Sequence, residues 1–170
     1  MKPIYIIGFM GAGKTSLGRK MAHQLGFSFI DLDRAIEVKV GRTVTSLFDS
    51  QGEAYFRKLE AETLKEISQP NTVIACGGGT PCFNHNLDYM FDEGLIVYLK
   101  MEPGMLLSRL QTNRHKRPLV AALSEENLVA FVYEKLAERE SFYINAHIIF
   151  YPMREKLEDL IRQIQNDHEK

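Results

Sequence analysis

The sequence has few cysteines, and they lack the spacing of known cysteine sites. Cys76 and Cys82 are the only two in 170 residues, and neither forms a Cys-x-x-Cys pair or stands beside histidines at metal-ligand spacing. A disulfide framework and a zinc site are therefore both disfavoured. We expect a reducing, cytoplasmic setting.

Neither sign of charge is in excess, and no apolar run is long enough to span a membrane. The 21 basic and 22 acidic side chains leave a formal net charge of -1, so no global charge attracts the chain to nucleic acid or to an acidic membrane. The apolar run IYIIGFM is too short for a span, and no small-residue cleavage site follows it, which argues against a signal peptide. We expect neither nucleic acid nor membrane as a partner.

Internal repeats, low-complexity tracts and linkers are also absent from the sequence. A composition of 45% hydrophobic and 25% charged residues is that of an ordinary globular protein, and 170 residues are too few for two typical domains. We therefore expect a single domain over residues 1–170, acting as a monomer.

Short β-rich runs alternate with longer helical patterns along the chain. The runs expected to be strands are 4–7, 27–31, 72–76, 95–99 and 147–151. Apolar residues recur at helical spacing between and after them, as at Leu17, Met21 and Leu25. This alternation predicts an α/β fold with a parallel sheet covered by helices on both faces. Residues 111–127 show no clear periodicity, and we expect a mobile loop there before a helix from about 125 to 142.

A glycine-rich segment follows the first expected strand and opens the first expected helix. Gly8, Gly13, Lys14 and Thr15 match the phosphate-binding pattern G-x-x-x-x-G-K-[ST] in the context that this pattern requires. Its backbone N–H groups and the helix N-terminus attract phosphates, the lysine reaches the outer phosphates, and the hydroxyl can ligate magnesium. A nucleoside triphosphate is the leading ligand, and a merely tight strand-to-helix turn is the alternative.

Other features favour a kinase over a guanine-nucleotide switch. The base-reading motif Asn-Lys-x-Asp is absent, and the run TVIAC leads into three glycines where many P-loop enzymes place a metal-holding aspartate. Asp31 and Asp33 can supply that carboxylate, because they end the second expected strand at the edge where ligands bind in such sheets. If strand geometry persists, both lie on one side, one facing magnesium and the other a substrate hydroxyl. The alternative for Asp33 is a helix cap.

Further motifs resemble those of the shikimate kinase family. They are LFDSQGEAYFRKLE (47–60), the glycines at 77–79, RPL at 117–119 and RESFY from Arg139, in the order and approximate spacing of that family. The resemblance implies a five-stranded, three-layer fold like that of P-loop nucleoside monophosphate kinases. It also implies a mobile lid at about 111–123, a substrate-binding region at about 32–60, and transfer of phosphate from ATP to the 3-hydroxyl of shikimate.

The resemblance also implies a role for each site residue, with ATP and Mg²⁺ as cofactors. The residues implied in catalysis are Lys14, Asp33 and Arg117. Those implied in nucleotide binding are Gly11, Ala12, Gly13, Lys14, Thr15, Ser16, Arg109 and Arg117. Those implied in substrate binding are Asp33, Arg57, Gly78, Gly79 and Arg139, and those implied in metal binding are Thr15 and Asp31. The planar, always-charged guanidinium suits a carboxylate, and an aspartate suits hydroxyl groups.

Two alternatives remain open at the level of the sequence. A regulatory protein could keep this fold and lose catalysis, but Lys14, Asp33 and both carboxylate-binding arginines are all present. A kinase of another small polyol acid, such as gluconate, is the alternative among enzymes.

Overall fold

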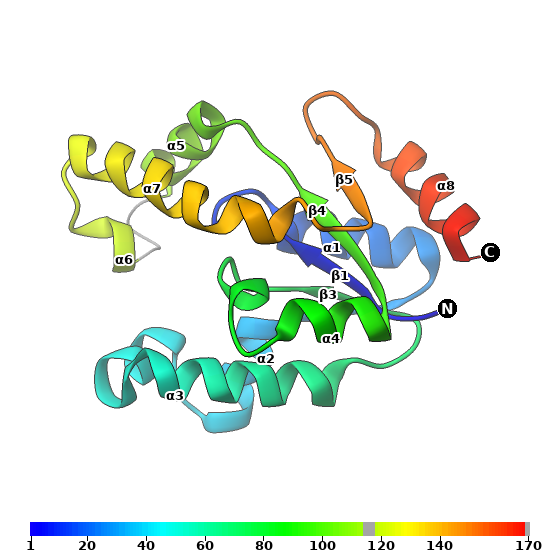
Figure 1. Cartoon of the computed structure of the whole chain (residues 1–170), viewed down its shortest axis with the longest axis horizontal. Coiled ribbons are helices and arrows are strands. Elements are labelled where there is room, and N and C mark those ends of the chain that lie inside the picture. Colours follow the sequence, from blue (N-terminus) through cyan, green and yellow to red (C-terminus); the bar gives the residue numbers. More distant parts are fainter. Residues whose placement is uncertain (114–117, 169–170) are drawn as a thin grey trace.

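Strands and helices alternate along the chain, which the structure, a computed structural model, describes for residues 1–113 and 118–168 (Figure 1). The strands are β1 (Ile4–Ile7), β2 (Ser28–Asp31), β3 (Thr72–Ala75), β4 (Leu95–Leu99) and β5 (Ile148–Phe150). The helices are α1 (Lys14–Leu25), α2 (Leu32–Val40), α3 (Val44–Ile67), the 3-10 turn η1 (Thr80–Cys82), α4 (Asn86–Glu93), α5 (Pro103–Thr112), α6 (Pro118–Ala121), α7 (Glu125–Tyr143) and α8 (Leu157–His168). The five expected strands are confirmed, to within a residue at either end.

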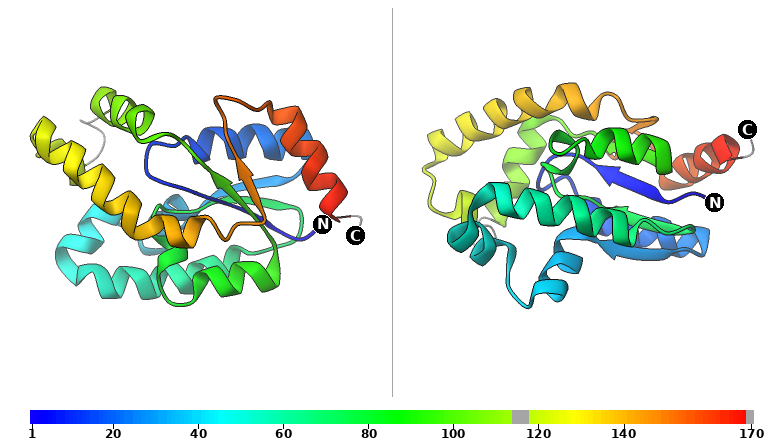
Figure 2. Two further views of the ribbon diagram at one scale, coloured as in Figure 1. Left: turned by 45° about the horizontal axis from the view of Figure 1, so that its top comes forward. Right: turned by 60° about the horizontal axis from the view of Figure 1, so that its bottom comes forward.

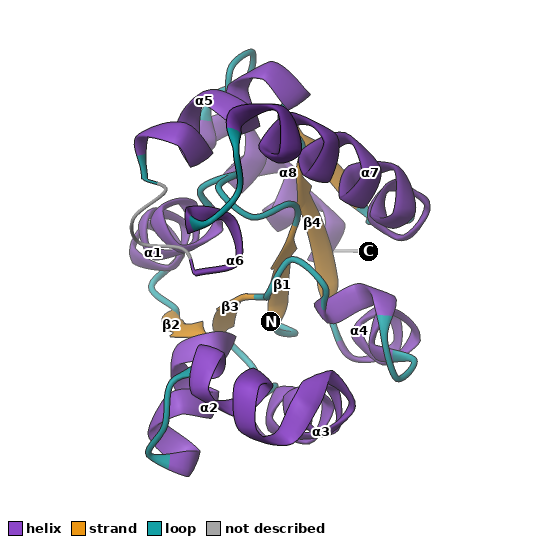
Figure 3. Cartoon of the chain, turned by 90° about the vertical axis from the view of Figure 1, so that its left-hand side faces the viewer, coloured by secondary structure: helices purple, strands orange, loops and turns teal. Residues whose placement is uncertain are grey.

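The sheet has the strand order β2-β3-β1-β4-β5, and every neighbouring pair is parallel. Helices cover both of its faces, with α1 and α8 on one face and α3 and α4 on the other (Figure 3). The expected α/β fold with a five-stranded parallel sheet between helical layers is therefore confirmed. No helix in the described ranges is both long enough and apolar enough to cross a membrane.

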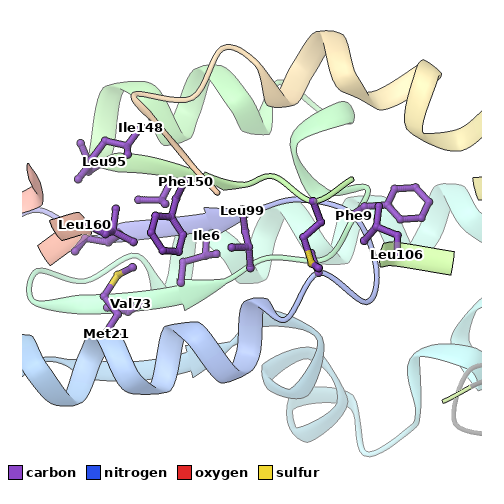
Figure 4. Packing of buried hydrophobic residues seen from close by; sticks show 14 of the residues in the cluster. Ile6, Phe9, Met21, Val73, Leu95, Leu99, Leu106, Ile148, Phe150 and Leu160 are labelled. Atoms are coloured by element: carbon purple, nitrogen blue, oxygen red, sulfur yellow. The ribbon is translucent and has the colours of Figure 1, made fainter. Parts of the chain in front are cut away.

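Alternate residues of each strand fill two separate cores, because successive side chains point to opposite faces of a sheet. Ile6 of β1 packs with Met21 of α1 and Leu160 of α8 in the first core (Figure 4). Tyr5 of the same strand packs with Leu64 of α3 and Met90 of α4 in the second. All six side chains are at most 2% exposed, so both helical layers are held to the sheet by apolar burial.

Two local expectations are wrong. Residues 111–127 are not one loop: α5 continues to Thr112, α6 forms over Pro118–Ala121, and α7 begins at Glu125. Val120 of α6 is fully buried, so apolar packing holds this short helix where periodicity gave no signal. Strand geometry also does not persist to Asp33, because β2 ends at Asp31 and α2 begins with the next residue.

Two neighbouring helices, α5 and α7, and a kink in α3 position the arginines of the site. α5 and α7 lie side by side (Figures 1, 2 and 3). Within α3, Gly52 has φ 81° and ψ 171°, so the helix is kinked there. These arrangements set the positions of the arginines described below.

Candidate active site

A cavity of about 330 Å³ lies at the carboxyl ends of the central strands. It is lined by the loop after β1, the two aspartates after β2 and the first glycines after β3: Met10, Gly11, Gly13, Lys14, Thr15, Ser16, Asp31, Asp33, Cys76, Gly77 and Gly78. β1 has β3 on one side and β4 on the other. The chain first builds the β2–β3 side of the sheet and then crosses over β1 to build the β4–β5 side, so the direction of the strand order changes at β1. Open parallel sheets bind their ligands at such a switch point.

The loop after β1 has the backbone of a phosphate-binding loop. Gly11 and Gly13 have φ of 81° and 98°, in the left-handed region that favours glycine. No side chain caps the N-terminus of α1, and its first turn has no acidic residue, so its N–H groups remain available to an anion. Lys14 Nζ donates to the carbonyl oxygens of Gly8 and Phe9 at 2.8 and 2.9 Å, which holds the ammonium group over the loop.

Arg109 joins α5 to the same loop. Its Nη1 lies 3.1 Å from the carbonyl oxygen of Ala12, to which it donates, and the Cβ of a residue replacing Gly13 would lie 3.2 Å from that nitrogen. The structure therefore places Arg109 at the predicted nucleotide site. Arg117, predicted to be catalytic and to bind the nucleotide, lies outside the described residues.

Thr15 and Asp31 place two side-chain oxygens side by side at the phosphate-binding loop. Thr15 Oγ1 donates to Asp31 Oδ2 at 2.7 Å, while Asp31 Oδ1 accepts from the backbone N–H of Arg34 at 3.2 Å and so caps α2. In the described ranges there is no group of three or more His, Cys, Asp or Glu that could hold a metal ion. A magnesium site needs only one or two protein oxygens besides phosphate and water, which this pair can provide.

Asp33 lies in the first turn of α2 and faces the same cavity as Asp31. Burial, and then the negative charges of Glu60 and Asp31, raise its pKa to about 6, although Lys14 and Arg57 act in the opposite direction. A carboxylate with a pKa near neutrality, next to a phosphate site, can accept a proton from a substrate hydroxyl.

Arg57 is held on several sides by α3 and by the segment after β3. Its Nη1 donates to Glu60 at 2.9 Å, its Nε and Nη2 both lie 3.2 Å from Glu53 Oε1, and its guanidinium carbon lies 4.2 Å from the Phe83 ring centroid. Glu60 is fully buried and also accepts from the Thr80 hydroxyl at 2.7 Å. Arg57 is itself only 8% exposed, so its guanidinium is fixed in one orientation.

The three glycines after β3 allow charged groups to approach the backbone closely. A Cβ atom at Gly79 would lie 2.5 Å from Arg57 Nη2, and one at Gly78 would lie 3.1 Å from Arg139 Nη1. A Cβ at Gly77 would lie 3.2 Å from Asp33 Oδ1. Arg57 from α3 and Arg139 from α7 therefore lie against adjacent glycines, and Asp33 lies against the glycine before them. The pair of guanidinium groups at Gly78 and Gly79 is called the arginine pocket below.

The structure brings together every predicted site residue that it describes, and it adds groups that sequence reasoning missed. These are the carboxylates of Glu53 and Glu60, the Thr80 hydroxyl, the Phe83 ring and the Tyr143 phenol. A signal existed for Glu60, because it lies on the apolar face defined by Phe56 and Thr63 at helical spacing. Glu53 also had a signal, because it stands four residues before Arg57 on α3, at the spacing of a helical salt bridge. Thr80, Phe83 and Tyr143 reach the site from distant segments, and no sequence pattern gives such distances.

A phosphate-binding loop with Lys14 and Thr15, two aspartates beyond it and an arginine pocket at its far side define a P-loop kinase that acts on a small anionic molecule. The model of the family described as shikimate kinase matches residues 10–169. The chain belongs to the shikimate kinase family.

Individual relatives agree with this assignment over nearly the whole chain. The sequence is 45% identical to a shikimate kinase of Phocaeicola vulgatus over 166 residues, which cover 97% of this chain and 93% of that protein. The crystal structure of shikimate kinase from Bacteroides thetaiotaomicron has a TM-score of 0.89 at 37% identity and covers 99% of this chain and 98% of its own. Shikimate kinase from Acinetobacter baumannii, solved in complex with shikimate, has a TM-score of 0.86 at 33% identity, with coverages of 99% and 93%.

Proposed function

We propose that this chain transfers the γ-phosphoryl group of ATP to the 3-hydroxyl of shikimate, giving shikimate 3-phosphate and ADP in the synthesis of aromatic amino-acid precursors. The observation that carries this proposal is the meeting of three groups in one site: the phosphate-binding loop, Asp33, and the Arg57–Arg139 pocket. Shikimate is a small anionic polyol, so it needs a carboxylate site and a hydroxyl acceptor within one molecule's length of the phosphate.

Phosphate is held by the loop after β1 and by the start of α1. Phosphoryl transfer proceeds through a loose transition state in which positioning and charge neutralisation provide most of the catalysis. Lys14 moves from the carbonyl oxygens of Gly8 and Phe9 to the phosphates, where its charge offsets the charge on the transferring group. Thr15 and Asp31 would hold Mg²⁺, directly or through water, and the ion when bound would neutralise phosphate charge.

Asp33 orients the acceptor hydroxyl and takes its proton. Its position in the first turn of α2 directs the carboxylate into the cavity, where Oδ1 lies beside Gly77, the first glycine after β3. Because the transition state is loose, the proton leaves late, so orientation of the hydroxyl contributes as much as basicity. An ionised Asp33 is required for both tasks.

Arg57 and Arg139 bind the substrate carboxylate. Glu53 accepts from Nε and Nη2 of Arg57, and Glu60 accepts from Nη1. One N–H group on Nη1 and one on Nη2 remain, and these two can donate side by side to a carboxylate. Because Glu60 is buried and bonded to Thr80, Arg57 needs little reordering when substrate binds.

The lid proposed for residues 111–123 joins two helices that both reach the site. It follows α5, whose Arg109 contacts the loop around Ala12, and precedes α7, which carries Arg139. Its closure would bring Arg117 to the phosphates and exclude water from the reaction. We also propose that the enzyme works as a cytoplasmic monomer without nucleic acid or membrane, because its net charge of -1 gives no general attraction to either and its two cysteines lack disulfide or zinc spacing.

A coupled assay of ADP release tests the proposal against its alternatives. Shikimate, gluconate and nucleoside monophosphates are each supplied with ATP and Mg²⁺. We expect turnover with shikimate and at most background release with the others. Turnover with gluconate alone would instead assign a different polyol acid, and release with none of them would favour a regulatory protein that has lost catalysis.

Replacing Arg57 with lysine tests the carboxylate site. The positive charge stays but the bidentate fork is lost, so we expect the KM for shikimate to rise about ten- to a hundredfold. The KM for ATP should change less than about twofold, because Arg57 faces the substrate side of the cavity. Steady-state kinetics with each substrate varied in turn provide the measurement. Equal increases in both KM values would show that Arg57 has a structural role instead.

A further inference from the structure

A buried tyrosine lies behind the glycine segment that carries the arginine pocket. The Tyr143 hydroxyl donates to the carbonyl oxygen of Gly78, and the tyrosine side chain is fully buried. Its ring packs against that of Tyr98, with 5.0 Å between the ring centroids, so the phenol is held in place. Tyr143 also stands one helical turn after Arg139 on α7, so a single helix fixes both the arginine and the glycine segment.

The contact fixes the central peptide unit of a turn, in which the Thr80 N–H donates to the Gly77 carbonyl oxygen at 3.2 Å and leaves the central peptide itself without a partner in the turn. The Gly78–Gly79 peptide lies between two residues without a Cβ atom, for which both orientations of the plane are accessible. In a planar trans peptide the C=O and the following N–H point in opposite directions. Because Tyr143 holds the carbonyl of Gly78, the N–H of Gly79 points away from the tyrosine. No acceptor for that N–H exists in the part of the chain that the structure describes.

The free N–H lies among the groups proposed to bind the substrate carboxylate. The guanidinium of Arg57 approaches Gly79 so closely that a Cβ atom there would lie 2.5 Å from Nη2, and Arg139 approaches Gly78 in the same way, at 3.1 Å. A backbone N–H beside two guanidinium groups forms a third donor for an anion. Turning the peptide over would replace this donor with a carbonyl oxygen, which repels a carboxylate.

We propose that Tyr143 is a positioning residue, which fixes the Gly78–Gly79 peptide so that the Gly79 N–H donates to the carboxylate of the substrate. The inference rests on the proposed function, in which Arg57 and Arg139 bind that carboxylate. Tyr143 acts through the Gly78 carbonyl and through its neighbour Arg139, and does not itself contact the substrate. It therefore sets affinity for the acid group and leaves the chemistry at the 3-hydroxyl unchanged.

Replacing Tyr143 with phenylalanine removes the hydroxyl and keeps the ring packing. We expect the KM for shikimate to rise about five- to tenfold, while kcat and the KM for ATP stay within about twofold of wild type. Tyr98→Phe is the matched control, because Tyr98 packs on the same ring but donates to Glu140 at 2.7 Å and not to the glycine segment. Its KM for shikimate should stay within about twofold of wild type.

A spectroscopic measurement separates positioning from a general structural role. In ¹⁵N relaxation dispersion, the Gly79 amide of Tyr143→Phe should show exchange between two orientations, which is absent from wild type and from Tyr98→Phe. A shikimate KM that stays within twofold of wild type, or a loss of kcat with both KM values raised together, would overturn the inference.

Arg57→Lys and Arg139→Lys, measured in parallel, distinguish this failure from failure of the proposed function. If both raise the KM for shikimate and Tyr143→Phe does not, the carboxylate site stands and the inference about Tyr143 is wrong. If neither raises it, the carboxylate binds elsewhere, and the proposed site and the role of Tyr143 are both wrong.

Discussion

Replacing Lys14 with alanine is expected to lower kcat by about a thousandfold while the protein stays folded. Lys14 begins α1 and holds its ammonium group over the phosphate-binding loop, and removal of one such group from a preorganised anion site typically has an effect of this size. Its Nζ hydrogen bonds go to the carbonyl oxygens of Gly8 and Phe9, in a loop rather than in either apolar core. Core packing therefore does not depend on this side chain.

The measurement for Lys14→Ala is single-turnover phosphate transfer together with urea unfolding. Lys20→Ala is the matched control, because Lys20 is an exposed lysine on the same helix and should keep wild-type turnover. Turnover within about tenfold of wild type in Lys14→Ala, with an unchanged unfolding curve, would show that phosphate binding does not depend on this lysine.

Replacing Asp33 with asparagine is expected to lower kcat by at least about a hundredfold and also to stabilise the fold. The amide cannot take a proton from the acceptor hydroxyl, and loss of a positioned base typically reduces the rate by this amount. In wild type, kcat/KM for shikimate should fall below a pH of about 6, because the raised pKa of Asp33 lets it become protonated there. Rate measurements between pH 5 and 8 provide the test.

The stability of Asp33→Asn should depend on pH in a defined direction. Because its pKa is raised from 3.8 to about 6 in the folded chain, the folded state binds the proton more tightly than the unfolded chain. Ionisation of Asp33 therefore destabilises the fold progressively as the pH rises from about 4 to about 6, by an amount on the order of 2 kcal/mol. Asparagine carries no charge, so the variant should gain this stability above pH 6 and match wild type near pH 4.

Urea unfolding at pH 4 and pH 8 provides the measurement for this second effect. Asp49→Asn is a suitable control, since Asp49 is an exposed aspartate on α3 that does not line the cavity. An Asp33→Asn variant that is less stable than wild type at pH 8 would show that the carboxylate stabilises the fold, contrary to its proposed burial next to Glu60 and Asp31.

The parts of the fold that were predictable are those in which local sequence decides the structure. The strands 4–7 and 95–99 are continuous apolar runs bounded by proline, glycine or lysine, and they form β1 and β4 over the expected residues. The phosphate-binding loop was equally predictable, because glycines with positive φ are required at fixed positions before Lys14. In each case the determining residues are adjacent in the chain.

The positions that could not be predicted depend on tertiary packing. Asp31 and Asp33 were expected to lie on one side if strand geometry persisted beyond residue 31, but capping by Asp31 starts α2 at Leu32. Helix α6 depends on burial of Val120, which its short sequence does not indicate. The contact between Tyr143 and Gly78 joins residues 65 positions apart, so only the assembled sheet and α7 bring them together.

The most direct test of the central claim is the structure of the reaction product. The enzyme is incubated with ATP, Mg²⁺ and shikimate, and the product is examined by ¹H–³¹P correlation NMR. If the site holds the substrate by its carboxylate and places one hydroxyl between Asp33 and the phosphate-binding loop, the transferred phosphorus should correlate with the ring proton at carbon 3 alone. Correlation with the proton at carbon 4 or carbon 5, or absence of any phosphorylated shikimate, would contradict the proposed arrangement of the site.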